Sequence, residues 1–316
     1  MKKKAIVVVG ATASGKTALG VHIAKKFNGE VISADSMQIY KGMDIATAKP
    51  TIEEMDGIKH HLIDFVDINQ QYSVSAYCDD ARRIFCDVNQ RNKIPVIVGG
   101  TGLYIDSFLS NTRFLESASS DSVRKELLLE AEKNGVGSLY EQLKAVDPEA
   151  AGNIHPNNIV RVVRALEIYK TTGMTLTEQN KQSHTVESDI EPLYIGINYS
   201  DRENLYNRIN QRVDLMLENG LLEEAKCFFG SSPSKTAFNA IGYKELKPFI
   251  DGCLAFDVCV ENLKRETRRY AKRQITWFKR NSKINWFYAD TQEKSDLYES
   301  IDNLIYSYLG GEENEE

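Results

Sequence analysis

The chain has 316 residues, of which 42% are hydrophobic and 27% charged, and its formal net charge at pH 7 is −6. This composition is typical of a globular protein with about two domains. No run of eighteen apolar residues is present, which argues against a membrane-spanning helix, and five scattered cysteines without a Cys-x-x-Cys pair argue against disulfides or a zinc site. We therefore expect a cytoplasmic protein that does not associate with a membrane.

Short β-branched runs alternate with helical patterns in the first hundred residues. The segment after Gly15 places Leu19, Ile23 and Phe27 on one helical stripe, and Ser75–Asn92 has the same periodicity. Four runs have the length and composition of buried strands: Ala5–Val9, Glu30–Ser33, Pro95–Val98 and Leu193–Ile197. This alternation predicts an α/β fold with a parallel sheet flanked by helices.

The pattern changes after about residue 115. A polar connector, Ser117–Asp121, is followed by helical patterns, and no strand pattern returns before Leu193. We predict a mostly helical insertion domain at 116–186, placed between two parts of one core at 1–115 and 187–316.

A phosphate-binding loop follows the first predicted strand. It has the P-loop pattern G-x4-G-K-[ST] between a strand and a helix, and it consists of Gly10, Ala11, Thr12, Ala13, Ser14, Gly15, Lys16 and Thr17. Backbone N–H groups of such a loop converge on an anion, and the following helix adds its positive N-terminal end. Lys16 supplies a mobile charge, and the Thr17 hydroxyl suits Mg²⁺ held between phosphate oxygens. The core is therefore predicted to resemble P-loop NTPases and to bind a diphosphate group with Mg²⁺.

The strand that often carries a magnesium-binding acid in kinases and NTPases lacks one here. Pro95–Val98 continues into Gly99-Gly100-Thr101-Gly102 without a carboxylate. We interpret the loop as holding a diphosphate that departs, rather than a triphosphate that is split.

Asp35 follows the second predicted strand, whose carboxyl end is expected beside the phosphate loop. A carboxylate at this place can bind Mg²⁺, accept a proton from a nucleophile, or cap the following turn. The residues alone leave these three roles open.

Residues 264–280 form a strongly basic segment, with eight basic residues against one acidic residue and a net charge of +7. Five of the basic residues recur at helical spacing on one face: Arg265, Arg268, Arg269, Lys272 and Arg273. Such a stripe can bind a phosphate backbone, whereas a solvated charged helix face would have the same pattern.

Eight blocks of the sequence occur in the order found in one enzyme family. They are Gly10–Thr17, Asp35–Tyr40, Asp44–Pro50, His60–Asp64, Gly99–Tyr104, Arg161–Glu167, Ala240–Glu245 and Thr267–Phe278. Together they resemble the tRNA dimethylallyltransferases, over nearly the whole chain and in the bacterial form, since no Cys/His zinc finger follows the core. One departure is Glu266, where many members carry Gln.

The resemblance implies transfer of the dimethylallyl group from dimethylallyl diphosphate to N6 of the adenosine 3′ of the anticodon (position 37), in tRNAs reading codons that begin with U. The flipped-out adenine attacks C1 of the donor, and diphosphate leaves. By the same resemblance Asp35 is the general base, while Thr17, Lys16 and Arg212 stabilise the diphosphate, with Mg²⁺ as cofactor.

The resemblance also implies contacts with the tRNA anticodon stem-loop, and we expect the protein to act as a monomer. The implied contacts are Asp35, Ser36, Met37, Gln38, Thr101, Arg124, Val160, Arg161, Val162, Val163, Arg164, Ala240, Ile241, Gly242, Tyr243 and Lys244, joined by Arg268, Arg269, Lys272 and Arg273 of the basic stripe. On the residues alone, Arg161 and Arg164 could instead be the polar face of a helix whose valines pack inward.

Three other functions fit parts of the sequence. A small-molecule kinase would share the P-loop, an adenylate isopentenyltransferase would prenylate AMP, ADP or ATP, and a non-enzymatic P-loop protein would bind RNA without turnover. The missing acid after Val98 and the basic stripe disfavour the kinase, and free nucleotides have less need of Arg161, Arg164 and the stripe.

Overall fold

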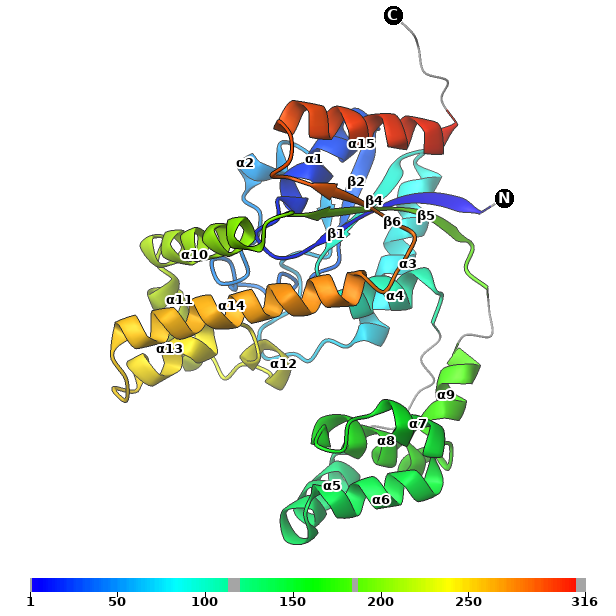
Figure 1. The fold of residues 1–316 in the computed structure, drawn as a ribbon, viewed down its shortest axis with the longest axis vertical. Coiled ribbons are helices and arrows are strands. Elements are labelled where there is room, and N and C mark those ends of the chain that lie inside the picture. Colours follow the sequence, from blue (N-terminus) through cyan, green and yellow to red (C-terminus); the bar gives the residue numbers. More distant parts are fainter. Residues whose placement is uncertain (1, 113–119, 184–186, 311–316) are drawn as a thin grey trace, which may run out of the picture. The chain divides into compact units, whose positions relative to one another are not determined.

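The computed structural model describes residues 2–112, 120–183 and 187–310 (Figure 1). The chain divides into two compact units, the first made of 1–109 and 189–316 and the second of 110–188. The insertion domain that the sequence predicts at 116–186 falls within the second unit. Each unit has its own hydrophobic core.

A six-stranded sheet forms the centre of the first unit, with strand order β3-β2-β4-β1-β5-β6 (Figure 1). Every pairing between neighbouring strands is parallel. The strands are β1 (Lys3–Gly10), β2 (Gly29–Ser33), β3 (His60–His61), β4 (Ile94–Gly99), β5 (Ile190–Asn198) and β6 (Ile284–Tyr288). A parallel sheet flanked by helices confirms the predicted fold class.

Helices cover both faces of this sheet. Successive side chains of a strand point to opposite faces, so an apolar strand buries side chains on both. Ile6 and Val8 of β1 pack with α1 and α15 on one face, whereas Val7 and Val9 pack with α3, α4 and α14 on the other (Figure 1). The bounds of these five helices are α1 (Lys16–Lys26), α3 (Val74–Gln90), α4 (Gly102–Leu109), α14 (Phe256–Phe278) and α15 (Lys294–Leu309).

Two strands have no counterpart in the sequence prediction. β3 has only two residues, too few for a periodic signal. In β6 only Ile284 is buried, so this edge strand lacks the continuous apolar run of the central strands. Both lie at the edges of the sheet, where burial imposes the weakest hydrophobic pattern.

A second cluster of helices extends the first unit beyond the sheet. It comprises α10 (Arg202–Glu218), α11 (Leu221–Gly230), α12 (Lys235–Phe238), α13 (Tyr243–Ile250) and part of α14, with the short α2 (Ile52–Met55) elsewhere in the unit. Tyr40 and Met43, from the segment after β2, are buried in its core. Phe228 stacks on Tyr243 there, with ring centroids 4.1 Å apart. The segment after β2 is therefore anchored among helices that come much later in the chain.

The described residues of the second unit form a bundle of five helices with clear end signals. Ser120, Asp147 and Asn158 accept hydrogen bonds from the first turns of α5, α7 and α8, and Gly173 ends α8 in the left-handed conformation. Buried leucines, alanines and valines form the core. The helices are α5 (Asp121–Asn134), α6 (Val136–Val146), α7 (Pro148–Asn153), α8 (Ile159–Thr172) and α9 (Leu176–Ser183).

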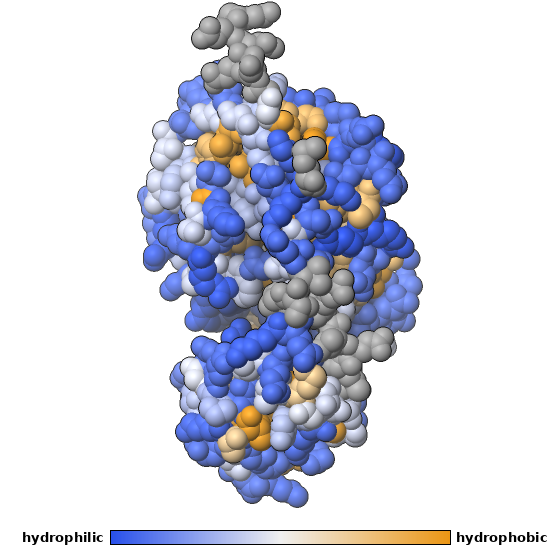
Figure 2. All heavy atoms as spheres, turned by 90° about the vertical axis from the view of Figure 1, so that its right-hand side faces the viewer, coloured by the Kyte–Doolittle hydropathy of each residue, from blue (hydrophilic) through white to orange (hydrophobic). Residues whose placement is uncertain are grey.

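On the face drawn in Figure 2, hydrophilic residues predominate and hydrophobic residues form small, separate patches. None of the helices in the described part of the chain has the length and hydropathy required to cross a membrane.

Candidate active site

The phosphate loop connects the carboxyl end of β1 to α1. Gly10 has φ +154°, and a Cβ there would lie 2.3 Å from the carbonyl oxygen of Ile197 on β5, so a side chain would displace the loop. Gly15 caps α1 in the left-handed conformation, with φ +95°, and Ala13 also has positive φ. These turns bring the loop backbone around the N-terminus of α1, the geometry that binds anions in P-loops.

One hydroxyl inside the loop is buried without a partner. Ser14 is 2% exposed, and its Oγ has no hydrogen-bond partner among the described residues. A buried hydroxyl without a partner costs free energy, and an anion oxygen in the loop would supply one. This orphaned donor supports the predicted diphosphate site.

Three charged side chains meet at the loop. Burial and the neighbouring Arg212 lower the pKa of Lys16 to about 7, while Asp35 acts in the opposite direction. Burial also lowers the pKa of Arg212, opposed by Asp35. Lys16 donates a hydrogen bond to the carbonyl of Ala11 in the loop. Two cations held close together with one carboxylate leave a net positive site, which favours a polyanion.

Asp35 both caps a turn and faces the pocket. Its Oδ1 accepts hydrogen bonds from the backbone N–H groups of Met37 (2.8 Å) and Gln38 (3.2 Å). The capping role considered from the sequence is therefore present. Asp35 also lines the pocket next to the phosphate loop. One oxygen can cap the turn while the other remains available for a proton.

A pocket of about 230 Å³ lies next to the phosphate loop, and apolar side chains form much of its lining. Thr12 and Arg212 mark its phosphate end, and Asp35 and Tyr270 bring polar groups to its wall. The apolar lining comprises Met37, Ala46, Ile209, Val213, Met216, Ala240, Ile241 and Leu263. A small hydrocarbon attached to a diphosphate matches this division.

Gln274 links the phosphate loop to the segment that follows β4. Its Oε1 accepts a hydrogen bond from the N–H of Thr12 (2.8 Å), and its Nε2 donates to the carbonyl of Gly100 (3.0 Å). The side chain is 5% exposed, and a Cβ on Gly100 would lie 2.1 Å from Nε2. The sequence prediction did not assign a role to Gln274. Its only signal was a polar residue on the inward face of an otherwise basic helix.

Magnesium can be tested against the donors present. Within the described ranges, no three His, Cys, Asp or Glu side chains form a possible ligand set. A metal held by protein side chains alone therefore does not fit. Mg²⁺ that keeps water ligands and binds phosphate oxygens does fit, because Thr17 offers a hydroxyl in the first turn of α1 beside the loop.

Most of the residues predicted to contact RNA in the first unit surround the same pocket. Ser36, Met37 and Lys244 line it together with Ala240, Ile241 and Gly242. Thr101 accepts a hydrogen bond from the N–H of Ser36 (3.1 Å). The Gln38 side chain instead donates to the carbonyls of Thr47 (3.2 Å) and Ala48 (3.1 Å) and holds the segment after β2.

Tyr243 corrects the prediction at this place. It is fully buried, and its hydroxyl donates to Glu224 (2.8 Å). Its side chain therefore packs in the core and is excluded from direct contact with RNA.

The basic stripe on α14 is confirmed as a helix face but differs from the prediction in one member. Arg268 is half-buried and donates to Asn210 of α10 (2.6 Å), so it fixes two helices together. Arg265, Lys272 and Arg273 are exposed, as is Arg269, which pairs with Glu266 (2.6 Å). Arg273 also lines the pocket.

In the second unit, two predicted RNA contacts share a buried carboxylate. Arg124 and Arg164 each donate to Oε2 of Glu167 at 3.0 Å, and Glu167 is 1% exposed. Val160 and Arg161 are exposed.

Two valines of the same helix correct the prediction. Val162 and Val163 are buried in the core of the second unit, so a side-chain contact with RNA is wrong for both. The alternative in which the valines pack inward is the correct one for these two.

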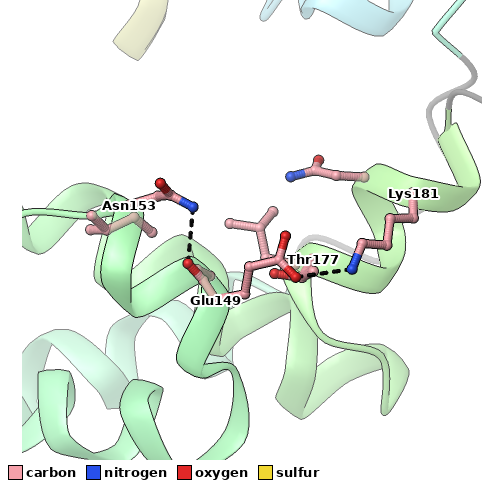
Figure 3. Close-up of a pocket in the computed structure, with 8 residues that line it drawn as sticks. Glu149, Asn153, Thr177 and Lys181 are labelled. Carbon is pink, nitrogen blue, oxygen red and sulfur yellow. Dashed lines mark hydrogen bonds and ion pairs between the residues drawn. The ribbon is translucent and has the colours of Figure 1, made fainter.

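Another pocket, of about 400 Å³, lies between α7 and α9 of the second unit (Figure 3). Its charged groups pair with each other, since Lys181 binds Glu149 (2.9 Å), and Asn153 donates to the Glu149 carbonyl (3.0 Å). It contains none of the residues predicted for catalysis. The pocket at the phosphate loop is therefore the candidate active site.

Curated relatives resemble the chain along nearly its entire length. A tRNA dimethylallyltransferase of Caldanaerobacter subterraneus is 47% identical over 309 residues, which cover 97% of each chain. A tRNA dimethylallyltransferase of Thermoanaerobacter sp. (strain X514) is 47% identical over 312 residues, which cover 98% of each chain.

Solved structures of similar proteins agree with the observed fold. The tRNA isopentenylpyrophosphate transferase of Bacillus halodurans is 41% identical with a TM-score of 0.74, covering 98% of this chain and 97% of its own. A eukaryotic dimethylallyltransferase, crystallised acting on tRNA, is 32% identical with a TM-score of 0.82, covering 99% of this chain and 81% of its own. The sequence profile described as IPP transferase matches residues 38–281. The chain therefore belongs to the IPP transferase family, as its ordered sequence blocks predict.

Proposed function

We propose that the protein transfers the dimethylallyl group of dimethylallyl diphosphate to N6 of the adenosine 3′ of the anticodon (position 37), in tRNAs reading codons that begin with U. The observation that carries this proposal is a phosphate loop that opens onto an apolar pocket with a carboxylate in its wall. The relatives named above act on tRNA, which supports tRNA as the acceptor.

The donor fits with its diphosphate on the loop and its hydrocarbon in the pocket. Backbone N–H groups at the N-terminus of α1, Lys16 and Arg212 would bind the phosphates, and Ile209, Val213 and Met216 of α10 line the pocket together with Arg212. As the C1–oxygen bond breaks, negative charge grows on the diphosphate, and these preorganised donors stabilise it. Thr17 would hold Mg²⁺ together with the diphosphate oxygens, and the ion would neutralise part of the leaving group's charge.

Asp35 accounts for the proton. The exocyclic amine of adenine is a weak nucleophile, so loss of its proton as the N6–C1 bond forms helps the reaction. The oxygen of Asp35 that does not cap the turn is the acceptor we assign. The adenine must be unstacked to enter the pocket, at a cost of a few kcal/mol that is least in a single-stranded loop.

The exposed basic residues of α14 are suited to the phosphates of the anticodon stem-loop, and the arginines of the second unit offer a further set of contacts. We further propose that the protein acts as a monomer in the cytoplasm, where its RNA substrate occurs.

Transfer of label from radiolabelled dimethylallyl diphosphate in the presence of Mg²⁺ tests the proposal. The acceptors are unmodified tRNA with adenosine 3′ of the anticodon, the same tRNA with guanosine at that position, and free AMP. Label on the adenosine tRNA alone is expected. Label on AMP would contradict the tRNA acceptor, and absence of label on all three would contradict prenyl transfer.

A further inference from the structure

Glu224, in α11, accepts hydrogen bonds from two segments that are distant in sequence. Its Oε2 accepts from the N–H groups of Asp44 (2.9 Å) and Ile45 (2.8 Å), and its Oε1 accepts from the N–H of Ala46 (2.9 Å) and the hydroxyl of Tyr243 (2.8 Å). Three consecutive N–H groups directed at one carboxylate form an anion-binding nest. Hydrogen bonds to a charged acceptor are roughly twice as strong as neutral ones.

Both segments are walls of the candidate active-site pocket. Ala46 and Thr47 line it, and so do the residues of 240–244 apart from the buried Tyr243. The two walls touch: Gly242 has φ +119°, and a Cβ built there would lie 2.9 Å from the Cβ of Ala46. Glu224 itself does not line the pocket, so it acts through these walls and not on the substrate.

The rest of the 44–49 loop is held by other groups. Gln38 binds the carbonyls of Thr47 and Ala48, and Lys49 donates to the carbonyl of Tyr40 (2.9 Å). These bonds fix the later half of the loop through its carbonyls and its lysine. The N–H groups at 44–46 are held by Glu224, while the carbonyls of Asp44 and Ile45 accept hydrogen bonds from the N–H groups of Lys49 (2.9 Å) and Ala48 (3.0 Å) within the loop. Loss of this carboxylate would therefore loosen the attachment of Ala46 to α11 without unfolding the loop.

We propose that Glu224 is a positioning residue that clamps the 44–47 loop against the 240–244 segment and thereby sets the affinity of the pocket for the hydrocarbon of the donor. This inference rests on the proposed function, in which the apolar part of the pocket holds the five-carbon group. It assigns no contact between Glu224 and the diphosphate, which lies at the Thr12 and Arg212 end of the pocket.

The test compares Glu224→Gln with Glu223→Gln. Both variants remove one negative charge from the same helix, but Glu223 is exposed, with an ion pair to Lys226 at 3.7 Å. We expect Glu224→Gln to raise the KM for dimethylallyl diphosphate about tenfold. The variant weakens hydrogen bonds to a charged acceptor, and their loss is expected to lower the affinity for the donor by about that factor. The affinity for inorganic diphosphate should stay within about twofold, and Glu223→Gln should match the wild type.

Hydrogen exchange of the 44–46 amides gives a readout that does not depend on catalysis. These amides should exchange faster by about tenfold in Glu224→Gln and normally in Glu223→Gln. Unchanged exchange together with an unchanged donor KM would overturn the inference while leaving prenyl transfer by the wild type intact. If the wild type transferred no prenyl group, the proposed function would fail, and the exchange experiment would still decide whether Glu224 holds the loop.

Tyr243→Phe provides a second variant that keeps the nest. It removes the hydroxyl bond to Glu224 and retains the stacked ring. We expect a smaller rise in donor KM, of about threefold, with normal exchange at 44–46. If Glu224→Gln and Tyr243→Phe raised the KM for donor and the KM for tRNA equally and both lowered Tm, Glu224 would have a general structural role. That result would contradict the inference.

Discussion

The phosphate loop and the pocket beside it are built in opposite ways. The loop is eight consecutive residues whose conformation follows from two glycines and the helix that begins at Lys16. Apart from Thr12 of the loop, the pocket takes its residues from the segment after β2, from α10, from 239–244 and from α14, and these are separated by up to about 240 residues of sequence. The loop is specified locally, whereas the pocket exists only after the chain has folded.

This difference separates two kinds of function. A local anion site is shared by many enzymes and says little about the reaction. The pocket determines which group is attached to the diphosphate and which base receives it. Substitutions in the two regions should therefore affect diphosphate binding and prenyl transfer separately.

The largest effect is expected at Asp35. Asp35→Asn keeps an oxygen that can accept from Met37 and Gln38 but removes the proton acceptor. We expect kcat to fall roughly 10²–10⁴-fold, with donor affinity nearly unchanged. Single-turnover rates with labelled donor measure this. A normal rate in Asp35→Asn with a large loss in Asp35→Ala would show that Asp35 serves only as a cap.

At the phosphate end, Arg212→Gln removes a charged donor expected to face the leaving group. The value of kcat/KM for dimethylallyl diphosphate should fall about 10²–10³-fold, because such donors act most strongly on the developing charge. The exposed Arg202, at the start of the same helix, gives a control as Arg202→Gln. Similar losses in both variants would contradict a specific role for Arg212.

The pH dependence of donor binding reports on Lys16. Its pKa is lowered to about 7, chiefly by burial and then by Arg212. A bound diphosphate stabilises the protonated amine and raises that pKa, so binding takes up a proton. Donor affinity is therefore complete below pH 7 and falls as the pH rises through about 7, by up to about tenfold per pH unit.

Calorimetry without tRNA measures this dependence. Dividing the affinity of the wild type by that of Lys16→Gln at each pH cancels the contribution from ionisation of the donor's phosphates, which is the same for both proteins. A ratio that stays constant from pH 6 to pH 9 would contradict the titration of Lys16 in this range.

Gln274 joins the local loop to the tertiary structure. Gln274→Leu leaves the N–H of Thr12 and the carbonyl of Gly100 without their partner, which should lower the free energy of unfolding by about 1–3 kcal/mol. Donor KM should rise several-fold because the loop loses an anchor. Urea unfolding measures the first effect. Thr276→Ala, at an exposed site on the same helix, is the control, and equal stability of the two variants would refute this role.

The smallest effect is expected on the exposed face of α14. Lys272→Ala should raise the KM for tRNA a few-fold and reduce the slope of log affinity against log salt by about one. The donor KM should not change. Lys294→Ala, on the helix that covers the other face of the sheet, is the matched control. Equal effects of the two variants would indicate attraction by net charge and contradict a binding face on α14.

Sequence reasoning found the central strands because burial on both faces requires uninterrupted apolar runs, as in β1 and β4. It missed β3 and β6, since edge strands are only partly buried. It found the phosphate loop and named Asp35 and Arg212. It could not find Gln274 or Glu224 as site-forming residues, because their partners lie 262 and about 180 residues away in sequence.

The phosphate-loop pattern, the parallel fold class and the family could be predicted from the sequence, because each depends on contiguous patterns or on blocks in a fixed order. The tertiary structure decided which residues of those blocks are exposed: Val162, Val163 and Tyr243 are buried, and Arg268 is tied to Asn210. It also decided that one carboxylate of α11 holds the wall of the pocket. A hydrogen bond between distant segments leaves no periodicity in the sequence, so only the folded chain reveals it.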